Sequence, residues 1–389
     1  MAFEFRLPTV AQMQSSPAGL QMMNYVNEDD FGTVLLTGCA GSGKTTVAVH
    51  RLVRLISQNK PAKLFTYHRL LVFAIRQILV NLELATPEKY GDTFHSWAYR
   101  ITGIQHDPGN PLPVAELVAE LEEALQANAQ MEEYIVDEGQ DLWRCVHESL
   151  PNHCKRYFVS ADDAQQVHSD RATVEEIEAA IKMRPGFHRY ALDQNFRNTY
   201  EIYRFARQFQ PQGNKIVWDT NTLTRLEHDT SRRGERPTVI SYVNDEDRDR
   251  HLQSQLRNAV QRGGSIAVLC PLSNHNAQAH QGESVQQTYE MLTGNGFRCS
   301  HYYNNQPVPD DLRDVLVTTF KSAKGLEFDE VYLPRCNFFR NIGNEWYVAC
   351  TRARRRLVLY RDAGEPQVDP IASFDPETYQ ALPVNVSGL

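Results

Sequence analysis

The stretch Leu35-Leu36-Thr37-Gly38-Cys39-Ala40-Gly41-Ser42-Gly43-Lys44-Thr45-Thr46 decides the fold of this chain. The apolar run from Val34 to Leu36 is typical of a buried strand, and apolar side chains at helical spacing follow the glycine-rich segment. This order of strand, loop and helix is the context in which the pattern G-x-x-x-x-G-K-[ST] binds phosphate. The sequence therefore predicts a phosphate-binding loop, the alternative being a glycine-rich turn that binds nothing.

The residue types in this loop suit a nucleoside triphosphate. Glycines let the backbone curl so that its N–H groups point inward at an anion, and the helix that follows adds the positive end of its dipole. Lys44 is expected to reach the β- and γ-phosphates, and the Thr45 hydroxyl is a candidate Mg²⁺ ligand. The residues expected to hold ATP here are Gly38, Cys39, Ala40, Gly41, Ser42, Gly43, Lys44, Thr45 and Thr46.

Length and composition place further limits on the protein. The 389 residues are enough for two domains of ordinary size, and 41% hydrophobic with 23% charged residues is typical of a globular protein. No apolar run is long enough to span a membrane, and the first residues lack a signal-peptide pattern, so a cytoplasmic location is expected. The seven cysteines include no C-x-x-C pair and are expected to be reduced thiols. A net charge of −8 argues weakly against polyanion binding but does not exclude a local basic groove.

A second motif supplies two adjacent carboxylates. The apolar run Tyr134 to Val136 predicts a strand that ends at Asp137 and Glu138, and ligands of open α/β sheets bind at this edge. Asp137 is a candidate Mg²⁺ ligand, and Glu138 is a candidate base for the attacking water. Gln165 follows the next predicted strand and is a candidate sensor of the γ-phosphate. Acidic pairs after strands also occur by chance; the phosphate loop upstream favours a function here.

Two other stretches are candidates for ligand contacts. Gln21 precedes the phosphate loop, and its amide offers one donor and one acceptor to an adenine edge. Gln12 and Gln14 are rivals, and a surface glutamine is an equally good interpretation. In the segment 92–98, aromatic residues lie beside hydroxyl and imidazole groups, which suits a single-stranded nucleic acid. Such aromatics are more often part of a hydrophobic core.

Taken together, these stretches resemble the UvrD/Rep/PcrA-like superfamily 1A DNA helicases. They occur in the family's order from about Gln21 to Arg354, which is nearly the whole chain. The matching stretches are GCAGSGKTT (38–46), FTYHR (65–69), TFHSWA (93–98), VDEGQD (136–141), ADDAQQVH (161–168), LDQNFRN (192–198), TTFKSAKGLEF (318–328) and YVACTRA (347–353).

The resemblance implies an α/β protein with two RecA-like P-loop domains, each a mostly parallel sheet flanked by helices, and ATP with Mg²⁺ in the cleft between them. It implies a first domain over 1–189 with a reduced accessory segment at about 103–130, a second over 190–363, and an irregular tail over 364–389. It places Gln21 and Phe196 on the adenine, Glu327 on the ribose, and Arg197 and Arg352 on the γ-phosphate as arginine fingers. The residues it places along single-stranded DNA are Phe65, Thr66, Thr93, His95, His168, Thr319 and Lys321.

The chain also departs from this family. The large accessory domains called 1B and 2B have no room here, Ser169-Asp170-Arg171 stands where relatives often have a base-stacking tryptophan, and Lys321 stands where many have histidine. Two classes of function follow. The first is a single-stranded-DNA-stimulated ATPase motor of the 3′→5′ type, in DNA repair or phage defence. The second is a nucleotide-dependent regulatory or scaffold subunit that works with a nuclease or other protein partner, as in anti-phage systems such as Gabija. A P-loop NTPase unrelated to DNA leaves TFHSWA, LDQNFRN and YVACTRA unexplained.

Overall fold

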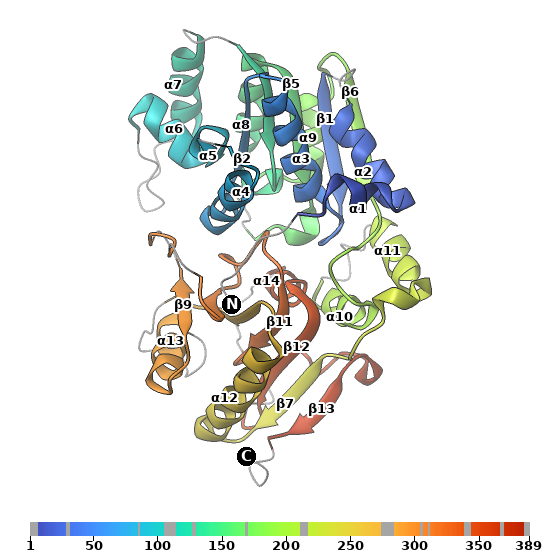
Figure 1. Ribbon diagram of the computed structural model, residues 1–389, viewed down its shortest axis with the longest axis vertical. Helices are drawn as coiled ribbons and strands as arrows, with labels where there is room; N and C mark the ends of the chain where they lie inside the picture. The colour runs from blue at the N-terminus through green and yellow to red at the C-terminus, as the bar shows by residue number, and fades with distance from the viewer. Residues whose placement is uncertain are drawn as a thin grey trace. The chain divides into compact units, whose positions relative to one another are not determined.

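The computed structural model describes residues 7–28, 32–84, 86–104, 114–126, 130–167, 170–210, 217–273, 284–303, 306–309, 312–337, 344–365 and 369–384. Contacts between residues divide the chain into two compact units, one of Phe5–Gln194 and one that contains the described residues from Asn195 onward (Figure 1). No helix in the described ranges combines the length and the apolar character needed to cross a membrane.

The described residues of the first unit form a six-stranded parallel sheet. Its strands are, in spatial order, β3 (Gly91–Thr93), β2 (Ala62–Thr66), β4 (Met131–Val136), β5 (Cys154–Ala161), β1 (Thr33–Gly38) and β6 (Phe187–Leu192). Its longer helices are α2 (Pro17–Asn27), α3 (Lys44–Ser57), α4 (Arg69–Asn81), α6 (Phe94–Thr102), α7 (Val114–Gln126) and α9 (Val174–Ile181), and its shorter ones are α1 (Val10–Gln14), α5 (Pro87–Tyr90) and α8 (Arg144–Ser149).

Helices cover both faces of this sheet. Crossovers between parallel strands are right-handed, so α3 and α4 lie on one face and α7, α8 and α9 on the other (Figure 1). All residues of β1 and β2 are buried, as expected for central parallel strands, which read as continuous apolar runs. Short 3₁₀ turns follow two of the strands, η1 (Gly139–Asp141) after β4 and η3 (Asp163–Gln165) after β5.

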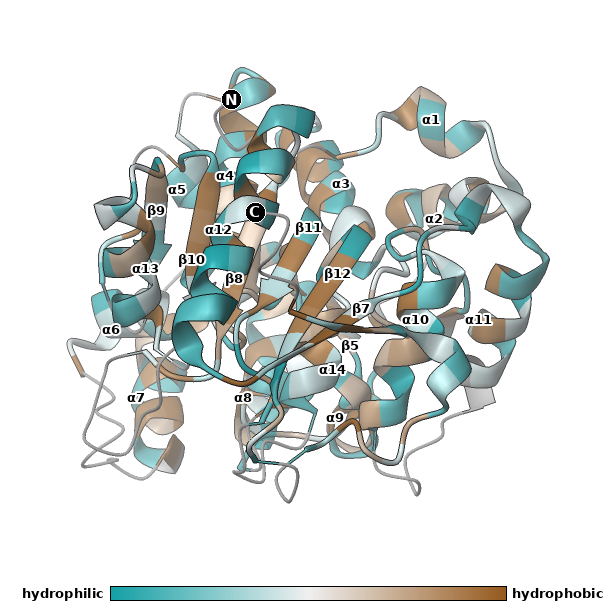
Figure 2. Cartoon of the chain, turned by 90° about the horizontal axis from the view of Figure 1, so that it is seen from below, coloured by the Kyte–Doolittle hydropathy of each residue, from teal (hydrophilic) through white to brown (hydrophobic). Residues whose placement is uncertain are grey.

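In the second unit, the described residues form a seven-stranded parallel sheet. Its strands are, in spatial order, β13 (Gln380–Pro383), β7 (Thr238–Tyr242), β12 (Ala353–Asp362), β11 (Phe328–Leu333), β8 (Ile266–Cys270), β10 (Val315–Thr319) and β9 (Cys299–Tyr302). Its helices include α10 (Tyr200–Ala206), α11 (Val217–His228), α12 (Asp245–Arg262), α13 (Val285–Gly294) and α14 (Glu345–Cys350). Figure 2 shows the contrast between apolar central strands and the largely polar α12, which begins at the N-cap Asn244 with three acidic residues in its first turn.

The predicted fold class, an α/β protein with two mostly parallel sheets flanked by helices, is confirmed.

The structure differs from the expectations in three segments. Residues 187–192 form β6, which pairs with β1, so the first sheet continues past the expected boundary at 189. The expected irregular tail contains β13, which pairs with β7 because its backbone extends along that strand's free edge. In the segment 211–236, for which the sequence predicts no particular element, Val217–His228 form α11. Of the expected accessory segment, residues 105–113 and 127–129 lie outside the described residues.

Candidate active site

Three loops of the first unit meet at one edge of its sheet. They follow β1, β5 and β4, which are neighbours in the order β4-β5-β1. Val136 lies opposite Val159, and Thr37 lies opposite Ala161, so the strands end at nearly the same level. The phosphate-loop residues, the Asp137–Glu138 pair and Gln165 are therefore brought to a common edge, although more than a hundred residues of sequence separate the first from the last.

The loop after β1 has a conformation that requires glycine. Gly41 and Gly43 have φ values of 73° and 98°, in the left-handed region. A Cβ on Gly43 would lie 2.5 Å from Met22 Sδ on α2, and a Cβ on Gly38 would lie 2.6 Å from both Leu192 O and Ser42 Oγ. The loop is thus closely packed on α2 and β6, and α3 begins directly after Gly43 with its N-terminus at the site.

Lys44 is the cation at the centre of this edge. Its ammonium donates to the carbonyl oxygens of Gly38 (2.8 Å) and Cys39 (3.0 Å) and lies 3.7 Å from Asp162 Oδ2. The residue is only 5% exposed. A buried charge of this kind needs a partner, and the carboxylates around Lys44 provide it.

Asp137 is a fully buried carboxyl with one oxygen left open. Its Oδ1 accepts from Ser160 Oγ, and it also receives a hydrogen bond from the Thr45 hydroxyl. Burial, followed by the neighbouring Glu138, raises the pKa of Asp137, while the hydrogen bonds and Lys44 act in the opposite direction. Within the described part of the chain, Asp137 Oδ2 and Ser42 Oγ are buried without a hydrogen-bond partner. A hydroxyl and a carboxylate side by side, with an open buried oxygen, are a donor set that fits Mg²⁺ bound with phosphate.

Glu138 and Gln165 belong to one chain of hydrogen bonds behind Asp137. Gln140 Nε2 donates to Glu138 Oε2 (2.6 Å), and Gln140 Oε1 accepts from the Asp162 backbone N–H (3.0 Å). Gln165 Nε2 in turn donates to Asp162 Oδ2 (2.6 Å). Hydrogen bonds therefore connect the Glu138 carboxylate, which follows β4, to Asp162 and Gln165, which follow β5. Ser160, Gln140 and Asp162 were not among the residues predicted to form the site; their position at strand ends beside the motifs was the signal in the sequence.

Of the three glutamines proposed for an adenine, Gln21 lies on the helix that contacts the loop. It is half-buried on α2, one residue before Met22, and donates to Tyr25 Oη (2.9 Å). The backbone at the end of α2 is held by Arg51 of α3, which donates to Tyr25 O (2.9 Å) and Glu28 O (2.8 Å). Gln12 is exposed and forms a capping box with Thr9, and Gln14 is exposed on α1. The capping box therefore explains the position of the Gln12 side chain without a ligand.

The residues expected along a nucleic-acid strand differ in exposure. Phe65, one of the expected nucleic-acid contacts, is fully buried, and its ring packs against Phe94, Trp97 and Tyr134 as part of the core. The reason is that β2 is an interior strand, covered on both faces. Thr66 is buried, and its Oγ1 has no partner among the described residues.

Two further expected contacts in this unit, Thr93 and His95, lie at the end of β3. Thr93 is the N-cap of α6, accepting from the Ser96 N–H (3.1 Å), and His95 is half-buried with its ring 5.2 Å from that of Tyr67. His168 lies outside the described residues. The core interpretation of the aromatics therefore holds for Phe94 and Trp97, whereas His95 keeps part of its surface accessible.

In the second unit, Arg197 and Glu327 form an ion pair. Arg197 Nε lies 2.9 Å from Glu327 Oε2, and the Glu327 side chain is 43% exposed. Burial raises the pKa of Glu327, but Arg197 and Arg354 outweigh it, so the pKa lies below its ordinary value. Phe196 precedes this pair and is half-buried. The expected adenine, ribose and γ-phosphate contacts Phe196, Glu327 and Arg197 are thus neighbours.

Arg352 has a different environment. It is fully buried, and its guanidinium donates to Val348 O (2.9 Å), Leu326 O (3.2 Å) and Thr351 Oγ1 (3.2 Å), all in its own unit. These bonds stabilise the segment from α14 to β12. Of the other expected strand contacts, Thr319 is bonded to Ser322 and Lys321 forms an ion pair with Glu345 (3.1 Å).

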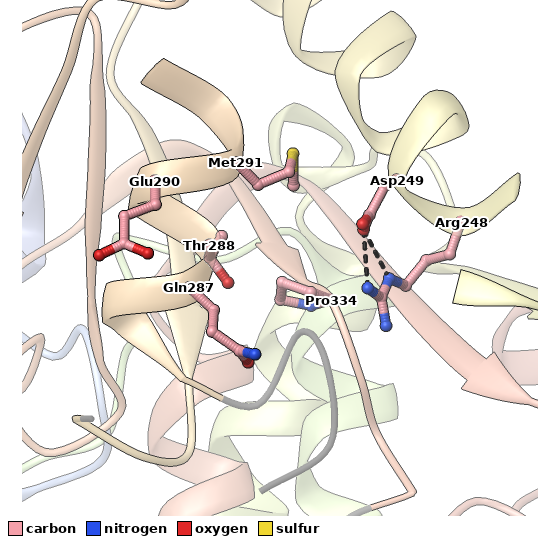
Figure 3. A pocket seen from close by; sticks show the side chains of 7 residues that line it. All are labelled: Arg248, Asp249, Gln287, Thr288, Glu290, Met291 and Pro334. Atoms are coloured by element: carbon pink, nitrogen blue, oxygen red, sulfur yellow. Dashed lines mark hydrogen bonds and ion pairs between the residues drawn. The ribbon is translucent and has the colours of Figure 1, made fainter. Parts of the chain in front are cut away.

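A pocket of the second unit lies apart from all of these residues. It opens between α12, α13 and Pro334, which directly follows β11 (Figure 3). The lining residues are Arg248, Asp249, Gln287, Thr288, Glu290, Met291 and Pro334. Arg248 and Asp249 neutralise each other there, with nitrogen–oxygen distances of 2.9 and 2.7 Å. None of the residues expected from the sequence to bind a ligand lines it.

Residues 32–293 match the family model described as Schlafen group 3, DNA/RNA helicase domain. No curated protein matches the chain. Among solved structures, the C-terminal domain of a possible DNA helicase from Lactobacillus plantarum WCFS1 is similar at 18% sequence identity and a TM-score of 0.34, covering 48% of this chain and 98% of that one.

Proposed function

The chain belongs to the Schlafen group 3 DNA/RNA helicase domain family, and from this premise we propose that it is an ATP hydrolase whose turnover depends on a single-stranded nucleic acid, with DNA as the first candidate. One observation carries the proposal. Lys44 and Thr45 follow β1, and Asp137 and Glu138 follow β4, at the edge where β4, β5 and β1 end; the buried Asp137 Oδ2 has no hydrogen-bond partner among the described residues.

Each residue of this edge has a role in binding or proton transfer. The loop N–H groups and Lys44 bind the phosphates, and Lys44 exchanges its bonds to the Gly38 and Cys39 carbonyls for phosphate oxygens. Asp137 and Thr45 would hold Mg²⁺, which would neutralise negative charge on the phosphates. Glu138 orients the attacking water and accepts its proton, and Gln165 contacts the γ-phosphate.

The remaining roles follow from the family resemblance. Gln21 and Phe196 contact the base, and Glu327 contacts the ribose. Arg197, which is held by an ion pair that solvent reaches, supplies positive charge to the transferred phosphate. Strand contacts in the first unit are made by His95 and the hydroxyls of Thr66 and Thr93, which lie at the ends of β2 and β3. Movement along the strand is in the 3′→5′ direction, in repair or phage defence and together with a protein partner.

Two substitutions test the ATP site. Lys44→Ala removes the phosphate contact and is expected to weaken binding of a fluorescent ATP analogue, whereas Glu138→Gln is expected to bind the analogue normally and to lose hydrolysis. Removal of one electrostatic contact to a transition state costs roughly 10²–10³ in turnover. Lys182→Ala, which changes an exposed lysine after α9, is the matched control. Normal hydrolysis by Glu138→Gln would overturn the proposal.

A further inference from the structure

Glu138 has a backbone conformation that its surroundings must support. Its φ and ψ are 58° and 48°, in the left-handed region. The other described non-glycine residues with positive φ, Asn59 and Glu83, follow the last turns of α3 and α4, where this conformation is common. Glu138 instead follows a buried strand and is 3% exposed. A residue strained in this way persists only where its neighbours fix it.

The turn from Glu138 to Asp141 is fixed from three sides. Gln140 holds the Glu138 carboxylate, as described above. His147 Nε2 lies 2.9 Å from Gly139 O, and His68 Nε2 lies 3.0 Å from Asp141 Oδ2. The first two contacts come from the motif itself and from α8, whereas His68 comes from a segment 73 residues away. An ionised carboxylate only accepts, so the imidazole N–H of His68 donates to Asp141.

His68 joins this turn to the part of the sheet edge that is expected to contact single-stranded nucleic acid. It is the N-cap of α4 and directly follows Tyr67. The Tyr67 ring lies 5.1 Å from the His68 ring and 5.2 Å from the His95 ring, in edge-to-face arrangements. His68 and Asp141 are 7% and 0% exposed, so their contact is shielded from water. A continuous series of contacts therefore runs from His95 to the carboxylate turn within one unit.

We propose that the His68–Asp141 hydrogen bond couples strand binding to ATP hydrolysis, with His68 as a positioning residue for Glu138. This inference rests on the proposed function. In this proposal the carboxylate turn, which holds Glu138 in a strained backbone conformation, is the element that both sites bias. A strand that contacts His95 shifts Tyr67 and His68, and the shift reaches Glu138 through Asp141. His68 and Asp141 touch neither ATP nor the strand in this scheme.

The test compares His68→Leu with His68→Gln. Leucine removes the donor and keeps an apolar side chain of similar bulk, whereas glutamine restores a donor at a similar reach. Steady-state ATP turnover is measured with and without oligodeoxythymidine, and the affinity for the oligonucleotide is measured by fluorescence anisotropy. Asp141→Asn changes the other partner, and His188→Leu, at an exposed position on β6, is the matched control. Thermal unfolding verifies that each variant is folded.

The expected result is that His68→Leu keeps the basal turnover and the strand affinity but loses stimulation by at least about fivefold, the lower end of usual coupling effects. His68→Gln regains stimulation, and His68→Leu combined with Asp141→Asn is no worse than the single changes. Normal stimulation in a folded His68→Leu protein would overturn the coupling and leave the proposed function intact. Basal turnover or strand affinity falling in parallel with stimulation would also overturn it. A wild-type protein that no strand stimulates would instead overturn the proposed function.

Discussion

At the scale of single residues, burial separates groups that the sequence treats alike. Arg197 and Arg352 both belong to motifs that the family resemblance assigns to the γ-phosphate. Arg352 is fully buried and uses its guanidinium on three acceptors of its own unit, whereas Arg197 pairs with the half-exposed Glu327. The hydrogen bonds of Arg352 therefore stabilise its own unit, whereas the ion pair of Arg197 is one that solvent reaches.

Replacement by lysine is expected to have different effects on stability and turnover at the two positions. Arg352→Lys loses two or more of its hydrogen bonds and leaves buried carbonyls unpaired, so the free energy of unfolding falls by about 1–3 kcal/mol. Arg197→Lys loses an ion pair that solvent reaches, which costs at most about 1 kcal/mol, while turnover falls by roughly 10³ if it acts as an arginine finger. Urea unfolding and ATP turnover on both variants check this. Equal loss of stability would contradict the distinction.

His147 gives a prediction for pH. It is fully buried between Tyr157 Oη (2.8 Å) and Gly139 O (2.9 Å), and burial lowers the pKa of this imidazole from 6.5 to about 4. In the unfolded chain His147 is protonated below about pH 6.5, whereas in the folded chain it is protonated only below about pH 4. The free energy of unfolding therefore falls as the pH is lowered from 6.5 towards 4.

For His147 alone the loss amounts to about 2 kcal/mol between about pH 7.5 and pH 5. Urea unfolding of the wild type and of His147→Gln at both pH values measures it, because the variant lacks this contribution. The wild type is expected to lose more stability than the variant on acidification, and His188→Gln, at an exposed position, is expected to follow the wild type. Parallel losses in wild type and His147→Gln would show that the histidine titrates normally in the folded protein.

At the scale of elements, the turn η1 is built around close packing with β5. A Cβ on Gly139 would lie 2.5 Å from Val159 Cγ2 and 3.3 Å from His147 Cε1. Gly139 is therefore required by contact with the neighbouring strand and not by a positive φ. The same contact fixes the distance between the turn that carries Glu138 and the strand that carries Ser160.

Gly139→Ala is expected to destabilise the protein by about 1–3 kcal/mol, the usual cost of overpacking, and to lower turnover because the added methyl displaces the carboxylate turn. Val159→Ala removes the methyl group that the new side chain meets. The double variant is therefore expected to recover part of both losses, so the effects are not additive. Thermal unfolding and ATP turnover of the two single variants and the double variant measure this. Additive losses would contradict the packing explanation.

At the scale of the whole molecule, the sequence predicted both parallel sheets, a glycine-rich loop directly after β1 and the position of Asp137 and Glu138 directly after β4. Those predictions succeeded because a phosphate loop and an apolar strand ending in carboxylates are local patterns. What could not be predicted depends on neighbours far away in sequence. Phe65 is a core residue because β3 and β4 flank its strand, and β13 is a strand because β7 offers a free edge. The His68–Asp141 contact joins segments whose spacing carries no signal.

The central claim is that ATP hydrolysis by this chain depends on a single-stranded nucleic acid. The most direct measurement is steady-state ATP turnover over a titration of oligodeoxythymidine, with the same length of oligouridine and of duplex DNA in parallel and Glu138→Gln as the inactive control. The account predicts low turnover without nucleic acid, saturable stimulation by the single strand and none in Glu138→Gln. Turnover by the wild type that is equally fast with no nucleic acid present would contradict it.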